Sequence, residues 1–252
     1  LDGDARDEQQ LYDGTATNVT YAYDGTASNV TYQEATNFSP DLVWIKGRVQ
    51  NQHSGVFDSV RGADLWLRSG TTDAENNFGG GYGVTSFDSN GFTIGSGSAI
   101  NANGDGNVAW CFNAGTDAPA SNTVGSIAST VKSNPDAGFS IVTWTGDGND
   151  ATVGHGLSSQ PELVITKGRA NLATYNQWAT YHKDLQDDYV VYLNLTNAEE
   201  DGLGNYWRKS AFSDTVIGLG NDIYGPNVNG TTMVAYCFHS VDGIQKVGSY
   251  TG

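Results

Sequence analysis

The segment PDLVWIKGR at residues 40–48 returns almost unchanged as PELVITKGR at residues 161–169. Self-similarity at a fixed period indicates a repeated structural unit, so the chain is predicted to hold two copies of one unit of about 120 residues. Three further landmarks recur in the same order: TDAE at 72–75 with TNAE at 196–199, Ile94-Gly95 with Ile217-Gly218, and VAWCF at 108–112 with VAYCF at 234–238.

A shorter marker, an aromatic residue followed by Thr or Asp and then Gly, begins at Tyr23, at Trp144 and at Tyr250. It precedes both copies and then closes the sequence. We therefore expect three parts: an N-terminal segment at residues 1–22 that contacts neighbours in an assembly, a first unit at 23–120 and a second unit at 121–252.

The N-terminal region has a small repeat of its own. Residues 12–21 and 23–32 are two passes of one ten-residue pattern, each predicted to be a short strand after an Asp-Gly turn. Residues 1–11 are polar and acidic, and we expect them to be disordered or docked on a neighbouring chain.

The composition and the periodicity predict β-structure. Charged residues make up only 16% of the chain and glycine occurs 33 times, which favours short strands joined by tight turns. Val191, Leu193 and Leu195 alternate with more polar neighbours and predict a strand. Both faces of VAWCF are apolar, which predicts a central strand. Each unit is therefore expected to be an all-β sandwich or jelly roll.

Further strands are expected at 91–96, 139–146 and 215–220, between clusters of Gly, Asn and Asp. Residues 125–132 follow an Ala-Pro-Ala segment and are expected to form a short helical turn that marks the boundary between the two units.

The two cysteines lie in matching contexts, as Cys111 of VAWCF and Cys237 of VAYCF. Equivalent positions in two units are poorly placed for a disulfide, which needs Cα atoms within about 7 Å. We predict two buried free thiols.

The charge and the hydropathy exclude two classes of partner. The formal net charge of −16 repels a phosphate backbone, so no nucleic-acid partner is expected. No apolar run approaches the roughly 20 residues that span a bilayer, so no membrane partner is expected either.

Five segments together resemble a repeated domain of tail-fibre and other structural proteins of tailed bacteriophages, especially those of marine and cyanobacterial hosts. The segments are SPDLVWIKGR (39–48), FDSVRG (57–62), VTSFDSNGFTIGS (84–96), NVAWCFNAG (107–115) and AGFSIVTWTGDG (137–148). The similarity covers nearly all of residues 23–252. The second copy departs from it at 178–185, where WATYHKDL stands in place of VFDSVRG.

This resemblance implies a fold, a location and partners. The fold would be two tandem β-sandwich units of the lectin-like jelly-roll type, related by internal duplication. The protein would lie on the virion exterior after assembly in the cytoplasm of the bacterial host. Its partners would be copies of itself, for example in a trimer, and other virion proteins. The resemblance supplies no catalytic residues.

The residues themselves predict no enzyme. The sequence has no phosphate loop, no HExxH motif and no paired CxxC, and the four histidines lack metal-ligand spacing. The E-x-D-x-x-E signature of one glucanase family is also absent. A glycan depolymerase is the weakest of three functional hypotheses, since it needs two carboxylates across a groove.

A carbohydrate-binding module that recognises host-surface glycan is the second hypothesis. Four tryptophans are candidates for stacking on sugar rings, although such residues are more often core: Trp44, Trp66, Trp178 and Trp207. Four cations end the repeated strand and either grip an acidic sugar or pair with carboxylates of the chain: Lys46, Arg48, Lys167 and Arg169.

Calcium is the one cofactor that the sequence suggests. Asp105 and Asn107 in one loop, and Asp147 and Asp150 in another, supply oxygen atoms of the kind that Ca²⁺ binds. The alternative is a pair of hairpin turns, which need the same residue types for positive φ.

A structural virion protein is the leading hypothesis. A module of a tail fibre or another exterior appendage would use two copies of one unit to lengthen a rod or to multiply weak contacts.

Overall fold

The computed structural model describes residues 38–48, 54–77, 81–104, 106–170, 176–221 and 225–252, and the backbone of four short strands before them. The chain forms two compact units, Leu1–Ser39 and Pro40–Gly252.

In the first unit, strand pairs are antiparallel: β1 (Thr15–Thr17) with β4 (Thr31–Gln33), and β2 (Thr20–Tyr21) with β3 (Ala27–Ser28). The acidic residues 1–11 and the two Asp-Gly turns expected here lie outside the described residues.

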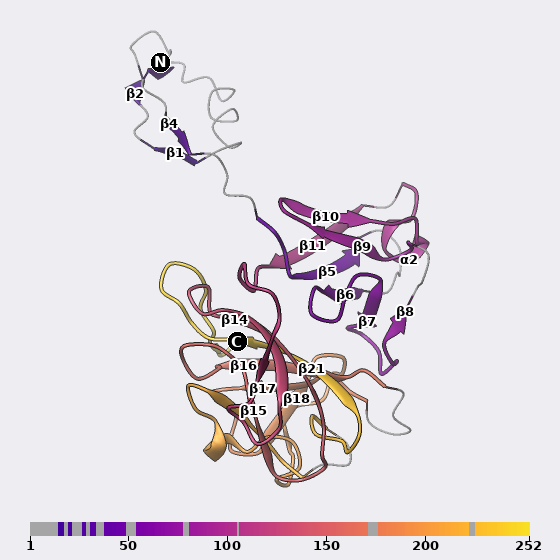
Figure 1. The fold of residues 1–252 in the computed structure, drawn as a ribbon, viewed down its shortest axis with the longest axis vertical. Helices are drawn as coiled ribbons and strands as arrows, with labels where there is room; N and C mark the ends of the chain where they lie inside the picture. The colour runs from indigo at the N-terminus through magenta and orange to yellow at the C-terminus, as the bar shows by residue number, and fades with distance from the viewer. Residues whose placement is uncertain are drawn as a thin grey trace. The chain divides into compact units, whose positions relative to one another are not determined.

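The larger unit contains a five-stranded sheet in the order β11-β5-β6-β7-β8, which we call the first sheet (Figure 1). Its strands are β5 (Leu42–Gly47), β6 (Gly55–Asp58), β7 (Leu65–Arg68), β8 (Asn76–Asn77) and β11 (Asn107–Phe112). A hairpin of β9 (Val84–Asp88) and β10 (Gly91–Ile94) and the single turn α2 (Ser98–Asn101) contribute to one face of it.

The second sheet has eight strands in the order β12-β13-β14-β21-β16-β17-β18-β19. They are β12 (Ala120–Asn122), β13 (Ser129–Asn134), β14 (Phe139–Thr145), β16 (Leu163–Gly168), β17 (Ala179–His182), β18 (Tyr189–Tyr192), β19 (Glu200–Asp201) and β21 (Thr232–Phe238). A separate pair, β15 (Ala151–Gly154) and β20 (Val216–Leu219), and the 3-10 turn η2 (Lys209–Ala211) complete the described elements.

The repeated segments occupy corresponding places in the two sheets. PDLVWIKGR forms β5 and PELVITKGR forms β16, and each pairs with the strand of its own VA(W/Y)CF segment. The registers also correspond, because Leu42 faces Phe112 in the first sheet as Leu163 faces Phe238 in the second.

The acidic residues that follow Pro40 and Pro161 make equivalent hydrogen bonds in the two copies. Asp41 accepts a hydrogen bond from the Ala114 amide (2.8 Å), and Glu162 accepts one from the Ser240 amide (2.8 Å). Each carboxylate thus binds the backbone just after the neighbouring strand.

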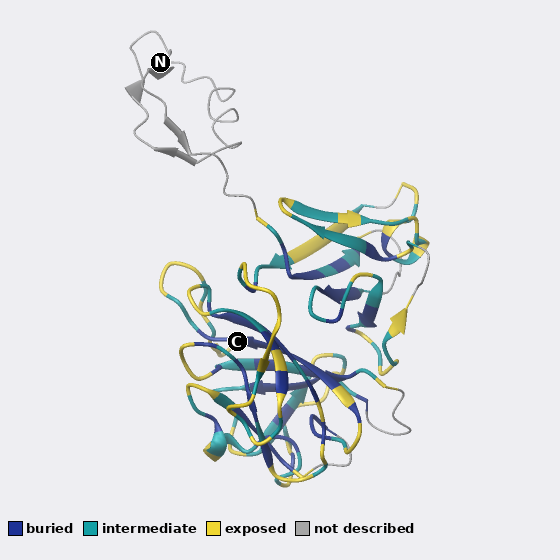
Figure 2. Cartoon of the chain, viewed as in Figure 1, coloured by how far each residue is buried: buried dark blue, intermediate teal, exposed yellow. Residues whose placement is uncertain are grey.

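The larger unit has three apolar cores. Figure 2 shows buried residues, in dark blue, along strands of both sheets. The first outer core joins the first sheet to the β9–β10 hairpin through Val43, Phe57 and Val84. The inter-sheet core lies between the two sheets. There the equivalent rings of Phe112 and Phe238 pack with their centroids 5.5 Å apart. The second outer core joins the second sheet to β15 and β20.

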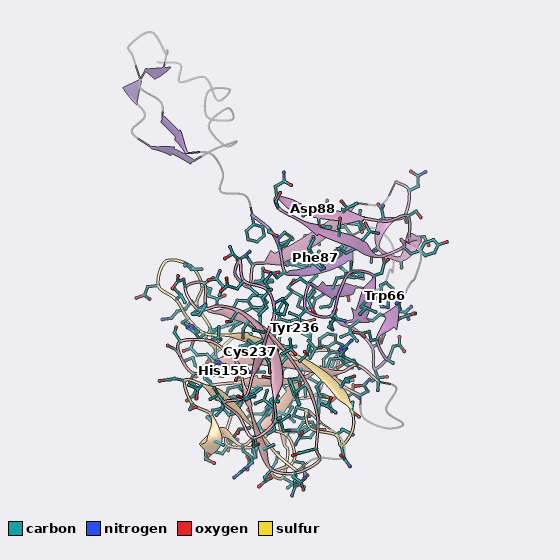
Figure 3. The ribbon with its side chains drawn as sticks, in the orientation of Figure 1. Trp66, Phe87, Asp88, His155, Tyr236 and Cys237 are labelled. Carbon is teal, nitrogen blue, oxygen red and sulfur yellow. The ribbon has the colours of Figure 1, made fainter. Side chains whose placement is uncertain are left out.

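Successive side chains of a strand point to opposite faces of the sheet, so one strand can contribute side chains to two cores. Tyr236 and Cys237 are neighbours on β21 (Figure 3), yet Tyr236 belongs to the inter-sheet core and Cys237 to the second outer core. The all-β prediction is confirmed. Among the described residues no helix is long and apolar enough to cross a membrane.

Two sequence-based predictions of local structure were wrong in part. Residues 129–134 are strand β13, not a helical turn, because Ser129 and Val131 alternate inward beside β14. The strand expected to reach Leu195 ends at Tyr192. VAYCF is central, as expected, and VAWCF pairs with β5 within the part of the chain that the structure describes. The strands expected near 91–96, 139–146 and 215–220 are confirmed as β10, β14 and β20.

Both cysteines are free, as predicted. Cys237 is fully buried, and burial raises the pKa of its thiol to about 12. Cys111 is only half-buried.

Candidate functional site

Three of the four tryptophans expected to stack on sugars are core residues. Trp66, Trp178 and Trp207 are at most 1% exposed, so none of them presents a ring face to solvent. The Trp178 indole also donates to the Arg68 carbonyl (2.8 Å), which ties the second sheet to the first. Trp44 is half-buried, and its indole N–H donates to Ser69 Oγ (3.0 Å).

The cations of the second copy are engaged within the protein. Lys167 is fully buried, and its Nζ donates to the carbonyls of Asn176 (2.5 Å) and Thr72 (3.2 Å). Burial lowers the pKa of Lys167 to about 7, and the charge of Asp73 offsets part of this effect. In the first copy, Lys46 is half-buried and Arg48 is exposed.

Glu75 joins the two sheets. Its carboxylate accepts hydrogen bonds from Nε (3.0 Å) and Nη2 (2.7 Å) of Arg169, and its amide donates to the Arg169 carbonyl (2.8 Å). Arg61 Nη1 donates to the same carboxylate (2.7 Å). The TDAE landmark of the first copy therefore binds the KGR landmark of the second.

A buried ion pair lies next to this contact. The side chains of Arg61 and Asp58 are fully buried, with Nε and Oδ2 at 2.5 Å, and the Tyr236 hydroxyl donates to Oδ2 of Asp58 (2.7 Å). Burial opposes the charge of Arg61, but the Asp58 and Glu75 carboxylates raise its pKa above the ordinary value. Burial also raises the pKa of Tyr236 well above its ordinary value. This cluster uses the FDSVRG segment, which the second copy replaces.

Two of the calcium candidates, Asp147 and Asp150, have partners within the protein. Asp147 Oδ1 accepts from the amide of Asn149 (2.9 Å) and from Nδ2 of Asn227 (3.0 Å), and Asp150 lies 3.5 Å from Arg208. Asn107 is exposed on β11, and Asp105 lies outside the described residues. Gly104 and Gly148 have positive φ, as the alternative of hairpin turns requires. In the described ranges no group of three or more His, Cys, Asp or Glu is arranged to hold a metal.

The buried histidine is a structural residue. His155 is 0% exposed; its Nδ1 accepts from the Leu157 amide (3.1 Å) and its Nε2 lies 3.2 Å from the Ser213 carbonyl. Burial lowers the pKa of His155 to about 4, so the ring is neutral at pH 7 and Nε2 is the donor.

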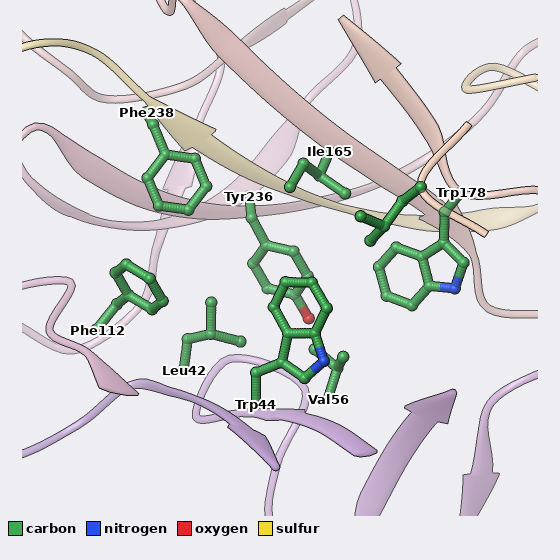
Figure 4. Close-up of a pocket in the computed structure, with 9 residues that line it drawn as sticks. Leu42, Trp44, Val56, Phe112, Ile165, Trp178, Tyr236 and Phe238 are labelled. Carbon is green, nitrogen blue, oxygen red and sulfur yellow. The ribbon is translucent and has the colours of Figure 1, made fainter. Parts of the chain in front are cut away.

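An apolar cavity of about 50 Å³ lies between the two sheets (Figure 4). Its wall is aliphatic and aromatic, and the hydroxyl of the one tyrosine in it is bound to Asp58. The cavity therefore offers no group that would orient a sugar or transfer a proton. The lining residues are Leu42, Trp44, Val56, Phe112, Ile165, Trp178, Leu193, Tyr236 and Phe238.

The outer edge of β11 is the candidate functional site. Among the described residues β11 pairs with β5 alone, whereas its counterpart β21 lies between β14 and β16. Val108 is 36% and Trp110 47% exposed, while the equivalent Val234 and Tyr236 are buried. Trp110 packs edge-to-face on Trp44 with ring centroids 5.9 Å apart, so its orientation is fixed.

Comparison with known families gives one match. The sequence model of a family described as a domain of unknown function, DUF7483, matches residues 15–252. The chain belongs to the DUF7483 family. No curated protein matches the chain, and no solved structure matches it. Since the match covers both copies of the repeat, the DUF7483 domain contains both sheets.

Several key residues of this DUF7483 domain were not among the predicted site residues. Trp110 was overlooked, although it lies in the repeated VAWCF segment. Glu75 lies in the repeated TDAE landmark, and Asp58 and Arg61 lie in FDSVRG, so a signal existed for each. The sequence did not reveal that these segments contact one another.

Proposed function

We propose that the chain is a structural component of a bacteriophage virion, a module of a tail fibre or another exterior appendage that assembles with copies of itself and with other virion proteins. The observation that carries this proposal is the outer edge of β11, which pairs with no strand among the described residues, with its exposed Val108 and Trp110. The proposal assigns no enzymatic activity to the chain.

An uncovered edge is a template for another strand, and soluble proteins usually protect it with lysine, proline or a bulge. The strand NVAWCF contains no charge and no proline, and its register with β5 is unbroken over six residues. Such an edge favours a protein whose strands are covered on assembly.

The duplication is part of the same proposal. We infer two units of the lectin-like jelly-roll type that arose from one ancestral sequence, and the corresponding strand orders and registers of the two sheets support this. Two copies joined by one core and by the Glu75 contact would give a stiff element, as an appendage requires.

A cryo-electron-microscopy map of the native particle would test the proposal. We expect the chain on the particle exterior with the outer edge of β11 paired to a strand. A particle that lacks the chain, or one in which this edge is open to solvent, would contradict the proposal.

Binding of host-surface glycan is a second candidate, and the exposure of Trp110 favours it. The Trp110 ring packs against Trp44, whose indole N–H donates to the Ser69 hydroxyl. The Ser69 hydroxyl is in turn hydrogen-bonded to the Ser54 hydroxyl. A glycan array with the wild type and with Trp110→Ala would test it. Binding that the variant loses would support this candidate, and the absence of binding by the wild type would remove it.

A further inference from the structure

We propose that a groove on the second sheet binds a saccharide that carries a carboxylate, such as a chain of uronic acids. The groove has a volume of about 290 Å³ and lies over parts of β12, β13, β14 and β21. β11 contributes none of the described residues that line it. The inference therefore goes beyond the structural role proposed above and does not depend on it.

The strand register places one row of hydroxyl side chains across the floor of the groove. Ser121 lies opposite Thr130, and Thr130 lies opposite Thr143. Residues directly opposite each other in antiparallel strands point to the same face of the sheet. The next residue on this face of β14, Ile141, belongs to the inter-sheet core. The row is therefore the polar continuation of the face that packs on the first sheet.

A second row lies beside the first and ends in a cation. Thr145 lies opposite Thr232. The Arg169 amide donates to the Thr232 carbonyl (2.8 Å), which continues the register of β16 with β21. Thr143 and Thr145 are two residues apart on β14, so both rows lie on one face. Five hydroxyls and one guanidinium thus line the same groove.

The five hydroxyls are not used by the protein itself. Their side chains are exposed or half-buried, and within the described ranges none of the hydroxyls has a hydrogen-bond partner in the protein. On the opposite face of the same sheet, the buried Thr166 hydroxyl instead donates to the Ala179 carbonyl (3.1 Å). A hydroxyl both donates and accepts hydrogen bonds, as the hydroxyls of a sugar do. The rows therefore suit a ligand that carries many hydroxyls.

Arg169 supplies a positive charge whose position is fixed. Glu75 accepts hydrogen bonds from Nε (3.0 Å) and Nη2 (2.7 Å) of Arg169, and among the described residues Nη1 has no partner. The Glu75 carboxylate also accepts from Arg61 (2.7 Å), so its one negative charge is divided between two guanidinium groups. A guanidinium held in this way binds a carboxylate with little further loss of side-chain freedom.

The groove has no acidic residue in its described lining, although the chain is strongly acidic. The chain has 28 Asp and Glu residues, yet Arg169 is the one charged residue among the described residues that line the groove. An acidic ligand therefore meets less repulsion here than over most of a chain with a net charge of −16. One cation suits a single carboxylate, whereas a polymer of phosphates would require several.

The affinity of one groove should be weak. Trp144 is the one aromatic residue in the described lining, and it is 4% exposed, so its ring face is not open for stacking. We expect a dissociation constant in the millimolar range for one chain. Several copies held together would bind a long saccharide more tightly.

Calorimetric titration of the wild type tests the class of ligand. The probes are the trimer of galacturonic acid and, as its neutral match, the trimer of galactose. We expect the carboxylated trimer to bind at least threefold more tightly, because only this trimer can pair with Arg169. The difference should shrink at high salt.

Two variants test the position of the site. Thr143→Val and Thr232→Val remove one hydroxyl each and keep a β-branched side chain that suits a strand. Each should weaken binding of the galacturonic acid trimer about fivefold, as expected for the loss of one hydrogen bond. Thr196→Val, at an exposed position that does not line the groove, is the matched control and should bind as the wild type does. Thermal melting checks that each variant is folded.

Three results would overturn the inference: a wild type that binds neither trimer, equal affinity for the two trimers, or threonine variants that bind as the wild type does. If binding is kept in the Thr143 and Thr232 variants but lost in Trp110→Ala, this inference fails and glycan binding at Trp110 stands. Each of these results leaves the proposed structural role to its own test, the map of the particle.

Discussion

Glu75 and Arg169 form a two-point ion pair between the first and second sheets, with Oε1–Nη2 at 2.7 Å and Oε2–Nε at 3.0 Å. The pair is largely shielded from solvent, with side chains 12% and 23% exposed. Because Arg61 shares the carboxylate, Glu75 also neutralises a fully buried cation. Two sequence landmarks that recur at a distance are thus direct partners in space.

Replacing Glu75 with glutamine should lower the free energy of unfolding by about 2–4 kcal/mol, because a buried arginine loses part of its compensating charge. Urea denaturation measures this. The matched control is Glu199→Gln, the equivalent exposed residue of the second copy, with an expected change within about 0.5 kcal/mol. Equal effects of the two variants would contradict the assignment.

Lys167 should make stability rise with pH. The folded chain holds this lysine at a pKa of about 7, below its ordinary 10.5, so between these values the unfolded chain binds more protons. The unfolding free energy should therefore increase between about pH 7 and pH 9, by up to about 1.4 kcal/mol per pH unit from this group. Lys167→Met should reduce the slope. An unchanged slope in the Lys167 variant would refute the prediction.

Asn227 should hold the loop that carries Asp147. Its buried side chain donates to Asp147 Oδ1 (3.0 Å) and to the Asn149 carbonyl (2.5 Å), and it accepts from the Asp147 amide (3.1 Å). Asn227→Ala should lower the free energy of unfolding by about 2–3 kcal/mol, because buried partners lose their hydrogen bonds. Urea denaturation measures this change. The exposed neighbour Asn229, changed to alanine, is the control.

Calcium should leave the melting temperature of the wild type unchanged, because N–H donors already occupy Asp147 Oδ1. Calorimetry with calcium and with a chelator checks this. A rise in melting temperature with calcium would instead support a metal site in this loop.

Filling the cavity between the sheets should stabilise the protein. Val56→Ile adds a methylene at the wall of the roughly 50 Å³ space and should raise the unfolding free energy by about 0.5–1 kcal/mol. Val43→Ile is the contrast, since Val43 is fully buried in the first outer core and is not among the residues lining the cavity. That change should be destabilising by about 1–3 kcal/mol. If Val43→Ile were the more stable of the two variants, the position of the cavity would be contradicted.

The repeat made much of the fold predictable. The clusters of Gly, Asn and Asp between strands helped to predict β10, β14 and β20, and the recurrence of PDLVWIKGR predicted equivalent strands. The sequence did not show that β11 and β21 differ in their described neighbours, because the two segments are nearly identical locally and only β21 is seen beside β14. The partners of Asp58 and Glu75 could not be predicted from the sequence for a related reason. Tyr236 is 178 residues from Asp58, and no local pattern encodes such a contact.

The inter-sheet core has a consequence for how the two copies can be inherited. Each copy presents a wide apolar face that the other copy covers, so Trp178 and Phe238 would become more exposed to water if the first copy were lost. A cut in the exposed connection at residues 116–119 would leave two fragments that stay together. Recombination can therefore exchange this module as a pair, whereas a single copy would aggregate.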